Sequence, residues 1–349
     1  MVKYAYAAVL EKIGSPLSLK NIEIPKLLHG QVLIKILFSG VCRSQLMEVK
    51  GARGIDPWLP HLLGHEGSGI VIDKGNGVTK VDLNDEVILG WIKGSGLEAP
   101  GAIYQCDNIK INSGRVTTFS NYSIVSENRL IKKPSSLSFD TAVLFGCALP
   151  TGAGMVFNEI KPKQNHSAIV LGLGGIGLSA LMALKSKKLK SVIALDISDE
   201  KLRLAKQFGA THTMNVGDAD FSKKIRYLIN EGVDFCLEST GMVSSIELGF
   251  SLIKKNGGKL LFASHPPEGE FIKLAPYDLI SGKKIAGSWG GATNPDLDIP
   301  IIYRAFARSG INLEALITKK YSLDQINQAL HDLENGEVFR PLIVMEHPN

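Results

Sequence analysis

The sequence lacks any concentrated block of charge. Its 349 residues carry a formal net charge of +5, yet no run of five or more like charges occurs. Proteins that bind nucleic acid by electrostatics gather basic residues into patches or stripes. We therefore expect no nucleic-acid partner.

Long hydrophobic runs are scarce as well. Glu11 and Lys12 interrupt the amino-terminal residues before the apolar core of a signal sequence can form. Residues 168–184 are almost wholly apolar and approach the roughly 17–25 residues of a membrane helix. Their glycines instead favour a strand, a turn and a buried helix, so we expect a cytoplasmic protein with no membrane partner.

Cysteine is rare, with four residues, whereas the 36 glycines predict many tight turns. In a reducing compartment, few cysteines favour free thiols or metal ligands over disulfides. The four are Cys42, Cys106, Cys147 and Cys236.

The length exceeds the usual size of one hydrophobic core, so we expect two domains. Up to about residue 135, short β-rich runs such as 31-QVLIKILFSG-40 alternate with Gly, Pro and Asn, which predicts a barrel-like β domain. From about residue 165, strands and helices alternate, as in 191-SVIALDI and 199-DEKLRLAKQFGA. This pattern is typical of a doubly wound parallel sheet, and the predicted fold class is α/β.

A glycine-rich motif, 172-GLGGIG-177, lies between an apolar strand and an apolar helix. Glycine-rich turns are common, but this context is the one that a dinucleotide site requires. Gly172 permits the tight turn, Gly174 allows a pyrophosphate to approach the backbone, and Gly177 allows close packing of helix on strand. Gly175 and Ile176 complete the predicted coenzyme-binding turn.

The next apolar strand ends in Asp196, nineteen residues after Gly177. A carboxylate there can accept hydrogen bonds from both ribose hydroxyls of NAD. It would repel the 2′-phosphate of NADP, by about 1 kcal/mol at about 4 Å in water and more near a protein surface. We therefore predict NAD as the coenzyme. Lys201 can reach the same ribose or can be a solvated helix residue.

Three candidate metal donors precede this motif: Cys42 in 40-GVCRSQ-45, His65 in 64-GHEGSG-69 and Cys147 in 146-GCALPTG-152. Singly, each cysteine can be a small buried hydrophobe and the histidine a satisfied polar residue. Together with an NAD fold, two thiolates and an imidazole leave one tetrahedral position open. That arrangement is typical of a catalytic zinc.

These motifs, in this order over about residues 5–345, resemble the zinc-dependent medium-chain alcohol dehydrogenase family. The resemblance implies a chaperonin-10-like catalytic domain over residues 1–148 and 289–349, with a Rossmann domain over 149–288. It implies a zinc-dependent transfer of hydride between an alcohol and NAD, giving an aldehyde or ketone.

The resemblance also assigns roles to individual residues. Cys42, His65 and Cys147 would hold zinc, and Glu66 would lie near the metal and coordinate it transiently. The hydroxyl of Ser44 would take the proton of the substrate alcohol. The residues assigned to the coenzyme are Arg43 and Arg340 at the pyrophosphate, and Thr151 and Ile176 at the nicotinamide.

The sequence departs from the family pattern in three places. Residues 90–122 contain only Cys106, so we predict no second, structural zinc. Gln45 replaces the aspartate that usually orients the ligand histidine, and it adds no negative charge. Met47 stands where some members have a proton-accepting histidine, so the proton must leave by ribose, water or another residue, such as His61.

Substrate and assembly are less determined by the sequence. Trp91 and Trp289 could line the substrate pocket or belong to the core, and the alcohol could be simple, a polyol or a sugar derivative. By family resemblance we expect a homodimer or homotetramer. The alternatives are a zinc-independent quinone or enoyl reductase, which would reduce C=C bonds, and a non-catalytic dinucleotide-binding protein.

Overall fold

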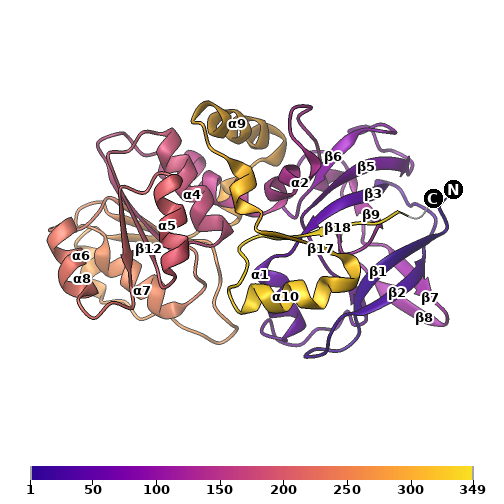
Figure 1. Ribbon diagram of the computed structural model, residues 1–349, viewed down its shortest axis with the longest axis horizontal. Coiled ribbons are helices and arrows are strands. Elements are labelled where there is room, and N and C mark those ends of the chain that lie inside the picture. Colours follow the sequence, from indigo (N-terminus) through magenta and orange to yellow (C-terminus); the bar gives the residue numbers. More distant parts are fainter. Residues whose placement is uncertain (1, 348–349) are drawn as a thin grey trace. The chain divides into compact units, whose positions relative to one another are not determined.

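The computed structural model describes residues 2–347 (Figure 1). Contacts along the chain divide it into two compact units. The first unit comprises the chain up to Cys147, Asn294–Leu297 and the chain from Leu313 onward; the second comprises Ala148–Thr293 and Asp298–Asn312. Residues 289–293 and 298–312 thus pack with the second unit, whereas we expected everything after residue 288 to belong to the catalytic domain. The functional domain boundaries stay a prediction.

The first unit is built from a closed five-stranded barrel, in the order β1-β2-β7-β8-β4, and a seven-stranded sheet, in the order β10-β6-β5-β3-β18-β17 with β9 paired to β3. The barrel strands are β1 (Tyr4–Leu10), β2 (Ser18–Glu23), β4 (His61–Leu62), β7 (Ile103–Cys106) and β8 (Ile109–Asn112). The sheet strands are β3 (Gln31–Gly40), β5 (Gly67–Lys74), β6 (Glu86–Leu89), β9 (Tyr122–Ser126), β10 (Leu130–Lys132), β17 (Lys319–Ser322) and β18 (Pro341–Val344).

Strand β3 shows why this unit folds as two packed layers. Its side chains alternate between two faces, as in any strand. Val32, Ile34 and Ile36 enter one hydrophobic cluster, and Leu33 enters another, with residues of the barrel strands. Because both faces are buried, β3 reads as a nearly continuous apolar run.

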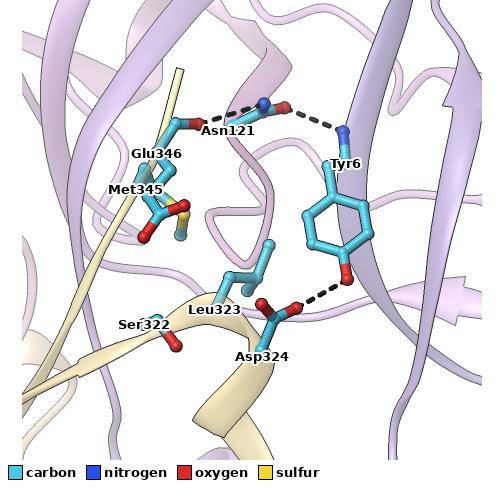
Figure 2. A pocket seen from close by; sticks show the side chains of 7 residues that line it. All are labelled: Tyr6, Asn121, Ser322, Leu323, Asp324, Met345 and Glu346. Carbon is cyan, nitrogen blue, oxygen red and sulfur yellow. Dashed lines mark hydrogen bonds between the residues drawn. The ribbon is translucent and has the colours of Figure 1, made fainter. Parts of the chain in front are cut away.

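The carboxyl-terminal segment returns to this unit. Its helix α10 (Ile326–Glu334) follows the short helix η6 (Leu323–Gln325), which begins with a capping box formed by Ser322 and Gln325. A small pocket lies where this segment meets β1 (Figure 2). There Tyr6 Oη donates a 2.6 Å hydrogen bond to Asp324, which raises the pKa of Tyr6 to about 12.

The remaining helices of the first unit are short. They are α1 (Arg43–Val49), η1 (Glu127–Arg129), α2 (Phe139–Ala142), η2 (Val143–Gly146) and η5 (Leu313–Leu316).

The second unit contains a six-stranded parallel sheet in the order β13-β12-β11-β14-β15-β16. This is the Rossmann strand order. Strands β12 and β13 follow on one side of β11, whereas β14, β15 and β16 follow on its other side. The strands are β11 (Ser167–Leu171), β12 (Ser191–Asp196), β13 (His212–Asn215), β14 (Phe235–Glu238), β15 (Lys259–Phe262) and β16 (Lys284–Gly287). The predicted α/β fold class, with a chaperonin-10-like domain and a Rossmann domain, is confirmed.

The helices of the second unit connect these strands. The apolar run 168–184 forms β11 and the buried helix α4, as predicted. The helices are α3 (Ala148–Gly154), the π-helix η3 (Met155–Ile160), α4 (Gly175–Ser186), α5 (Asp199–Gln207), α6 (Phe221–Ile229), α7 (Val243–Leu252), α8 (Pro276–Ile280) and η4 (Gly290–Ala292), and α9 (Pro295–Arg308) begins in the first unit.

Among the described residues, no single helix is long and apolar enough to cross a membrane. The helical segments Phe139–Gly146 and Ala148–Ile160 have that length and apolar composition only when taken together, and they are bent by 53° relative to each other.

Candidate metal and coenzyme sites

Three soft donors meet in the first unit. The ligand atoms of Cys42, His65 and Cys147 all lie within 4.8 Å of one another. His65 Nε2 lies 3.2 Å from Cys147 Sγ. Two thiols and an imidazole at this spacing match the ligand set of a three-residue zinc site with one open position.

The backbone that presents the donors is tightly constrained. Cys42 is the N-cap of α1, directly after β3. His65 follows Gly64, whose φ is +86° and whose added Cβ would lie 2.4 Å from Thr118 Oγ1. Only glycine suits both demands, because the left-handed region strains other residues and no space exists for a side chain. Cys147 follows the short helix η2.

Gln45 links two of the donors. Its Oε1 accepts a 2.9 Å hydrogen bond from the backbone N–H of Cys42, and its Nε2 lies against His65 Nδ1. The residue that replaces the family's aspartate therefore touches the histidine it was expected to orient.

Glu66 and Arg340 form a buried ion pair beside the donors. Arg340 Nη2 donates to Glu66 Oε2, while Glu66 Oε1 is buried without a partner in the described chain. Burial raises the pKa of Glu66, and the charge of Arg340 opposes that rise. Arg340 is only 6% exposed, so it is not a surface arginine.

The two thiols are electrostatically coupled. The Cys42 sulfur accepts a hydrogen bond from Cys147, which lowers the pKa of Cys42 well below its ordinary value and raises that of Cys147. For His65, burial lowers the pKa, but the contact with Cys42 raises it overall. A metal that needs thiolates therefore finds one thiol ready to ionise and must displace the proton of the other.

Other residues predicted near the metal differ in their contacts. Ser44 Oγ, in the first turn of α1, is buried and has no partner in the described chain. Arg43 is exposed, and Met47 is half-buried on the same helix. His61 has both ring nitrogens in use, at 2.7 Å from Asp56 Oδ2 and 3.0 Å from the carbonyl oxygen of Leu62. A proton path through His61 would have to break one of these contacts.

The glycine motif of the second unit has the predicted backbone roles. Gly172 has φ +87°, and Gly174, the N-cap of α4, has open space around it. A Cβ on Gly177 would lie 1.9 Å from the Gly172 carbonyl oxygen, so helix and turn pack without room for a side chain. Gly175 and Ile176 form the first turn of α4.

Asp196 lies beside this turn. Its Oδ2 accepts a 2.7 Å hydrogen bond from Leu173 N, and its Oδ1 accepts one of 2.9 Å from Ser198 N. Each oxygen keeps a second lone pair for a ribose hydroxyl. Lys201, on α5, donates its backbone N–H to Ser198 Oγ as part of the helix cap.

The remaining site candidates are divided between the units. Trp91 is half-buried, and its backbone N–H donates to the carbonyl oxygen of Gly146, the residue before Cys147. In the second unit Thr151 is buried, whereas Trp289 is 83% exposed and is therefore not a core residue.

Residues 90–122 form the β7–β8 hairpin and its flanking loops. Cys106 is a half-buried free thiol on β7. In the described residues, Cys42, His65 and Cys147 make up the one group of at least three His, Cys, Asp or Glu side chains that could hold a metal.

One contact was missed from the sequence. Thr240 packs on Gly172, and the buried carboxyl of Glu238 holds Thr240. The available signal was an acidic residue that ends an apolar strand directly before 239-STG.

Family comparisons agree with this geometry. Residues 29–135 match the model of the alcohol dehydrogenase GroES-like domain, and residues 175–302 match that of the zinc-binding dehydrogenases. The S-(hydroxymethyl)glutathione dehydrogenase of Synechocystis sp. is 30% identical, over 97% of this chain and 98% of that protein. The alcohol dehydrogenase class-3 of Cereibacter sphaeroides is 29% identical, over 97% and 99%.

Solved structures are similar over the whole chain. The benzyl alcohol dehydrogenase of Acinetobacter calcoaceticus has a TM-score of 0.88 at 28% identity, covering 99% of this chain and 100% of that one. An alcohol dehydrogenase zinc-binding domain protein of Burkholderia ambifaria has a TM-score of 0.90 at 26% identity, with the same coverage. The chain therefore belongs to the zinc-dependent medium-chain alcohol dehydrogenase family and is an alcohol–NAD oxidoreductase.

Proposed function

We propose that one catalytic zinc, held by Cys42, His65 and Cys147, supports hydride transfer between an alcohol and NAD in this protein. The observation that carries the proposal is the convergence of three donors within 4.8 Å. Borderline-soft Zn²⁺ prefers sulfur and imidazole ligands, and three protein ligands leave a fourth position for substrate.

The chain's own groups supply the proton chemistry. Zinc, when bound, acts as a Lewis acid that lowers the pKa of the substrate alcohol. Ser44 has a buried hydroxyl with no partner in the described chain, two residues after Cys42. Its oxygen can accept the substrate's proton and pass it outward, and Met47 cannot continue that relay.

Glu66 has a role next to the metal in this proposal, rather than as a proton-transfer base. Its Oε2 is held by Arg340, and its Oε1 is free to turn toward the donors. A buried guanidinium requires a counter-charge, so the pair also keeps Arg340 in the site.

NAD is the proposed coenzyme, bound by Gly172, Gly174, Gly175, Ile176 and Gly177. The backbone N–H groups at the start of α4 suit a pyrophosphate. Asp196 favours NAD over NADP because a 2′-phosphate would face its carboxylate.

The finer coenzyme contacts follow the family. We propose that Arg43 and Arg340 contact the pyrophosphate, Thr151 the nicotinamide and Lys201 the ribose. The burial of Thr151 and Arg340 suits contacts with a bound group more than with solvent.

We also propose that the protein has no structural zinc, because residues 90–122 contain one cysteine and form a β-hairpin. The Gly-, Ser- and Asn-rich loops beside Trp91 suit a polar alcohol such as a polyol or sugar derivative, with Trp289 as a second pocket residue. We further propose a cytoplasmic homodimer or homotetramer. Its catalytic domain would comprise residues 1–148 and 289–349, and its coenzyme domain residues 149–288.

The zinc-free reductase alternative has less support. A reductase of C=C bonds has no need of a buried Cys–His–Cys cluster, and a non-catalytic protein has no need of a buried hydroxyl beside it.

Metal analysis tests the proposal directly. We expect about one zinc per chain in the purified protein, and a loss of that zinc in Cys42→Ser. The matched control is Cys106→Ser, which removes a half-buried thiol outside the cluster and should retain the zinc. Protein without zinc, whose turnover is unaffected by chelators, would contradict the proposal.

Substrate class is tested by a panel of simple alcohols, polyols and sugar alcohols, followed by NADH absorbance. A higher kcat/KM for polyols than for simple alcohols of equal length supports the polar pocket. The reverse order contradicts it.

A further inference from the structure

The carboxyl of Glu238 is an unusual group for its position. It ends β14, is 0% exposed, and is in register with Leu171 on β11 and Phe262 on β15. Side chains in register lie on the same face of a sheet, so the carboxyl faces the apolar cluster that contains Leu171 and Cys236. Acidic side chains are almost never fully buried unless they are paired.

The hydrogen bonds of Glu238 are one-sided. Oε1 accepts two bonds, from the backbone N–H of Thr240 at 2.6 Å and from the Thr240 hydroxyl. The Thr240 hydroxyl itself accepts from Met242 N at 3.1 Å, so its single proton must point to Glu238. Oε2 has no partner in the described chain.

Thr240 in turn touches the coenzyme-binding turn. A Cβ on Gly172 would lie 2.6 Å from Thr240 Cγ2 and 3.0 Å from its backbone nitrogen. The neighbouring Ser239 donates a 2.9 Å hydrogen bond to the Gly172 carbonyl oxygen. The position of residues 239–240 therefore determines where the first glycine of the turn can lie.

We propose that Glu238 is a positioning residue for NAD: through Thr240 it holds Gly172 in the conformation in which the glycine turn accepts the pyrophosphate. This inference rests on the proposed binding of NAD at that turn. Glu238 touches neither coenzyme nor substrate in this account and acts through Thr240.

The charge of Glu238 then matters for coenzyme affinity. Burial raises its pKa, against the lowering effect of the Thr240 and Gly241 hydrogen bonds. Because Oε1 already accepts two bonds, a proton on the carboxyl belongs on Oε2. Ionisation at higher pH leaves an anion with an unpartnered oxygen in apolar surroundings. This disfavours the conformation in which Gly172 and its turn accept the pyrophosphate. Coenzyme affinity should therefore fall as pH rises.

Other titratable groups lie on β14 and on the elements packed against it. Cys236 lies two residues before Glu238 on the same strand, and burial raises the pKa of its thiol. The carboxylate of Glu247 on α7 accepts a hydrogen bond from Lys273 N, and Lys185 on α4 donates one to the carbonyl oxygen of Gln207. Lys259 is the first residue of β15 and is in register with Phe235, at the other end of β14 from Glu238.

The test is NADH binding, measured by fluorescence titration from pH 6 to pH 10 on the full-length protein. Glu238→Leu keeps a side chain of similar volume but loses the oxygen that accepts from Thr240, and it should raise the Kd for NADH at least tenfold. Thr240→Val should weaken binding in the same direction. Glu238→Gln keeps the acceptor, so its Kd at neutral pH should stay within threefold of wild type, without the wild-type loss of affinity as pH rises.

Glu247→Gln is the matched control, because it neutralises another carboxylate of the same unit and should leave the Kd and its pH dependence unchanged. Wild-type affinity in both Glu238→Leu and Thr240→Val overturns the inference, as does a loss of affinity with rising pH that persists in Glu238→Gln. If Glu238→Leu does not fold, the other two variants decide. A wild-type protein that binds zinc but no NADH would instead refute the proposed coenzyme site.

Discussion

At the scale of single residues, the candidate metal donors match the family pattern, whereas two residues beside them depart from it. Ser44 has the hydroxyl that the proposed proton relay needs, while Gln45 and Met47 stand where the resemblance implies an aspartate and, in some members, a histidine. The structure brings Gln45 against His65 and leaves the Ser44 hydroxyl buried without a partner in the described chain. These two residues give the sharpest predictions at this scale.

Ser44→Ala should lower kcat by about 100-fold or more, because general acid–base groups contribute roughly 10²–10⁴-fold. Zinc content and NADH affinity should stay unchanged, since Ser44 is not a metal ligand. Ser44→Thr, which keeps the hydroxyl, is the control and should retain most of the activity. Steady-state kinetics with metal analysis checks this, and equal kcat in Ser44→Ala and wild type would exclude the relay.

Gln45→Asp should bind zinc about tenfold more tightly, because outer partners of a ligand histidine change metal affinity by roughly 10–100-fold. The added negative charge makes the metal less electrophilic, so the acidic limb of the pH–rate profile should move to higher pH. Chelator competition and pH–rate profiles measure the two effects. Gln45→Asn, which adds no charge, should gain no affinity for zinc. An unchanged pH–rate profile in Gln45→Asp would argue against the hypothesis that the charge at position 45 tunes the electrophilicity of the metal.

At the scale of elements, a carboxylate anchors the loops around residues 79–97. The buried Glu127, in η1, accepts 2.6 Å hydrogen bonds from the backbone N–H groups of Thr79, Lys80 and Leu97. Burial acts to raise the pKa of Glu127, but these bonds lower it overall. The loop that precedes the β7–β8 hairpin is thus held by main-chain hydrogen bonds to one side chain.

Glu127→Gln should lower the free energy of unfolding by about 3 kcal/mol, because it weakens bonds to a charged acceptor and leaves buried N–H groups without one. Urea denaturation at pH 7 measures the change. Glu98→Gln, at an exposed carboxylate paired with Lys93 and Arg115, should cost less than about 1 kcal/mol.

The pH dependence of the same contact has a definite sign. Because the folded-state pKa of Glu127 is depressed, its contribution is present above the unfolded pKa and is lost as pH falls through the folded value. The difference between wild type and Glu127→Gln should shrink on acidification. A difference that stays constant down to strongly acidic pH would contradict the role of the charge.

At the scale of the whole molecule, the proposed zinc would link residues far apart in the sequence. Cys42 and His65 come from loops next to the sheet of the first unit, and Cys147 lies where that unit ends. A ligand that binds only the folded state stabilises it by mass action.

Removal of zinc by a chelator should therefore lower the Tm. At a free zinc concentration of about 100 Kd the stabilisation is about 2.7 kcal/mol, which corresponds to roughly 5–10 °C for a unit of this size. Differential scanning calorimetry measures the shift. Added Zn²⁺ should restore the Tm, whereas Mg²⁺, which prefers oxygen ligands, should not. A chelator-induced shift of equal size in Cys147→Ser would show that the metal acts elsewhere.

The two-part fold, the glycine turn and the family could be predicted from the sequence, because they depend on local patterns. Residues 172–177 and the strand before them carry their meaning in a short window, and strand β3 was predicted with its bounds. The three candidate metal donors were predicted from their residue types and their order along the chain, and their ligand atoms lie within 4.8 Å of one another.

Which side chains meet depends on how the chain packs in three dimensions. This packing paired Arg340 with Glu66, brought Gln45 to His65, engaged both nitrogens of His61 and joined Glu238 through Thr240 to Gly172. The contact between Arg340 and Glu66 does not follow from a local pattern, because the two residues are 274 apart in the sequence and meet only when β18 pairs with β3. Burial also depends on the packing of the whole chain. For this reason the sequence alone could not show that Arg340 is buried and balances the charge of Glu66.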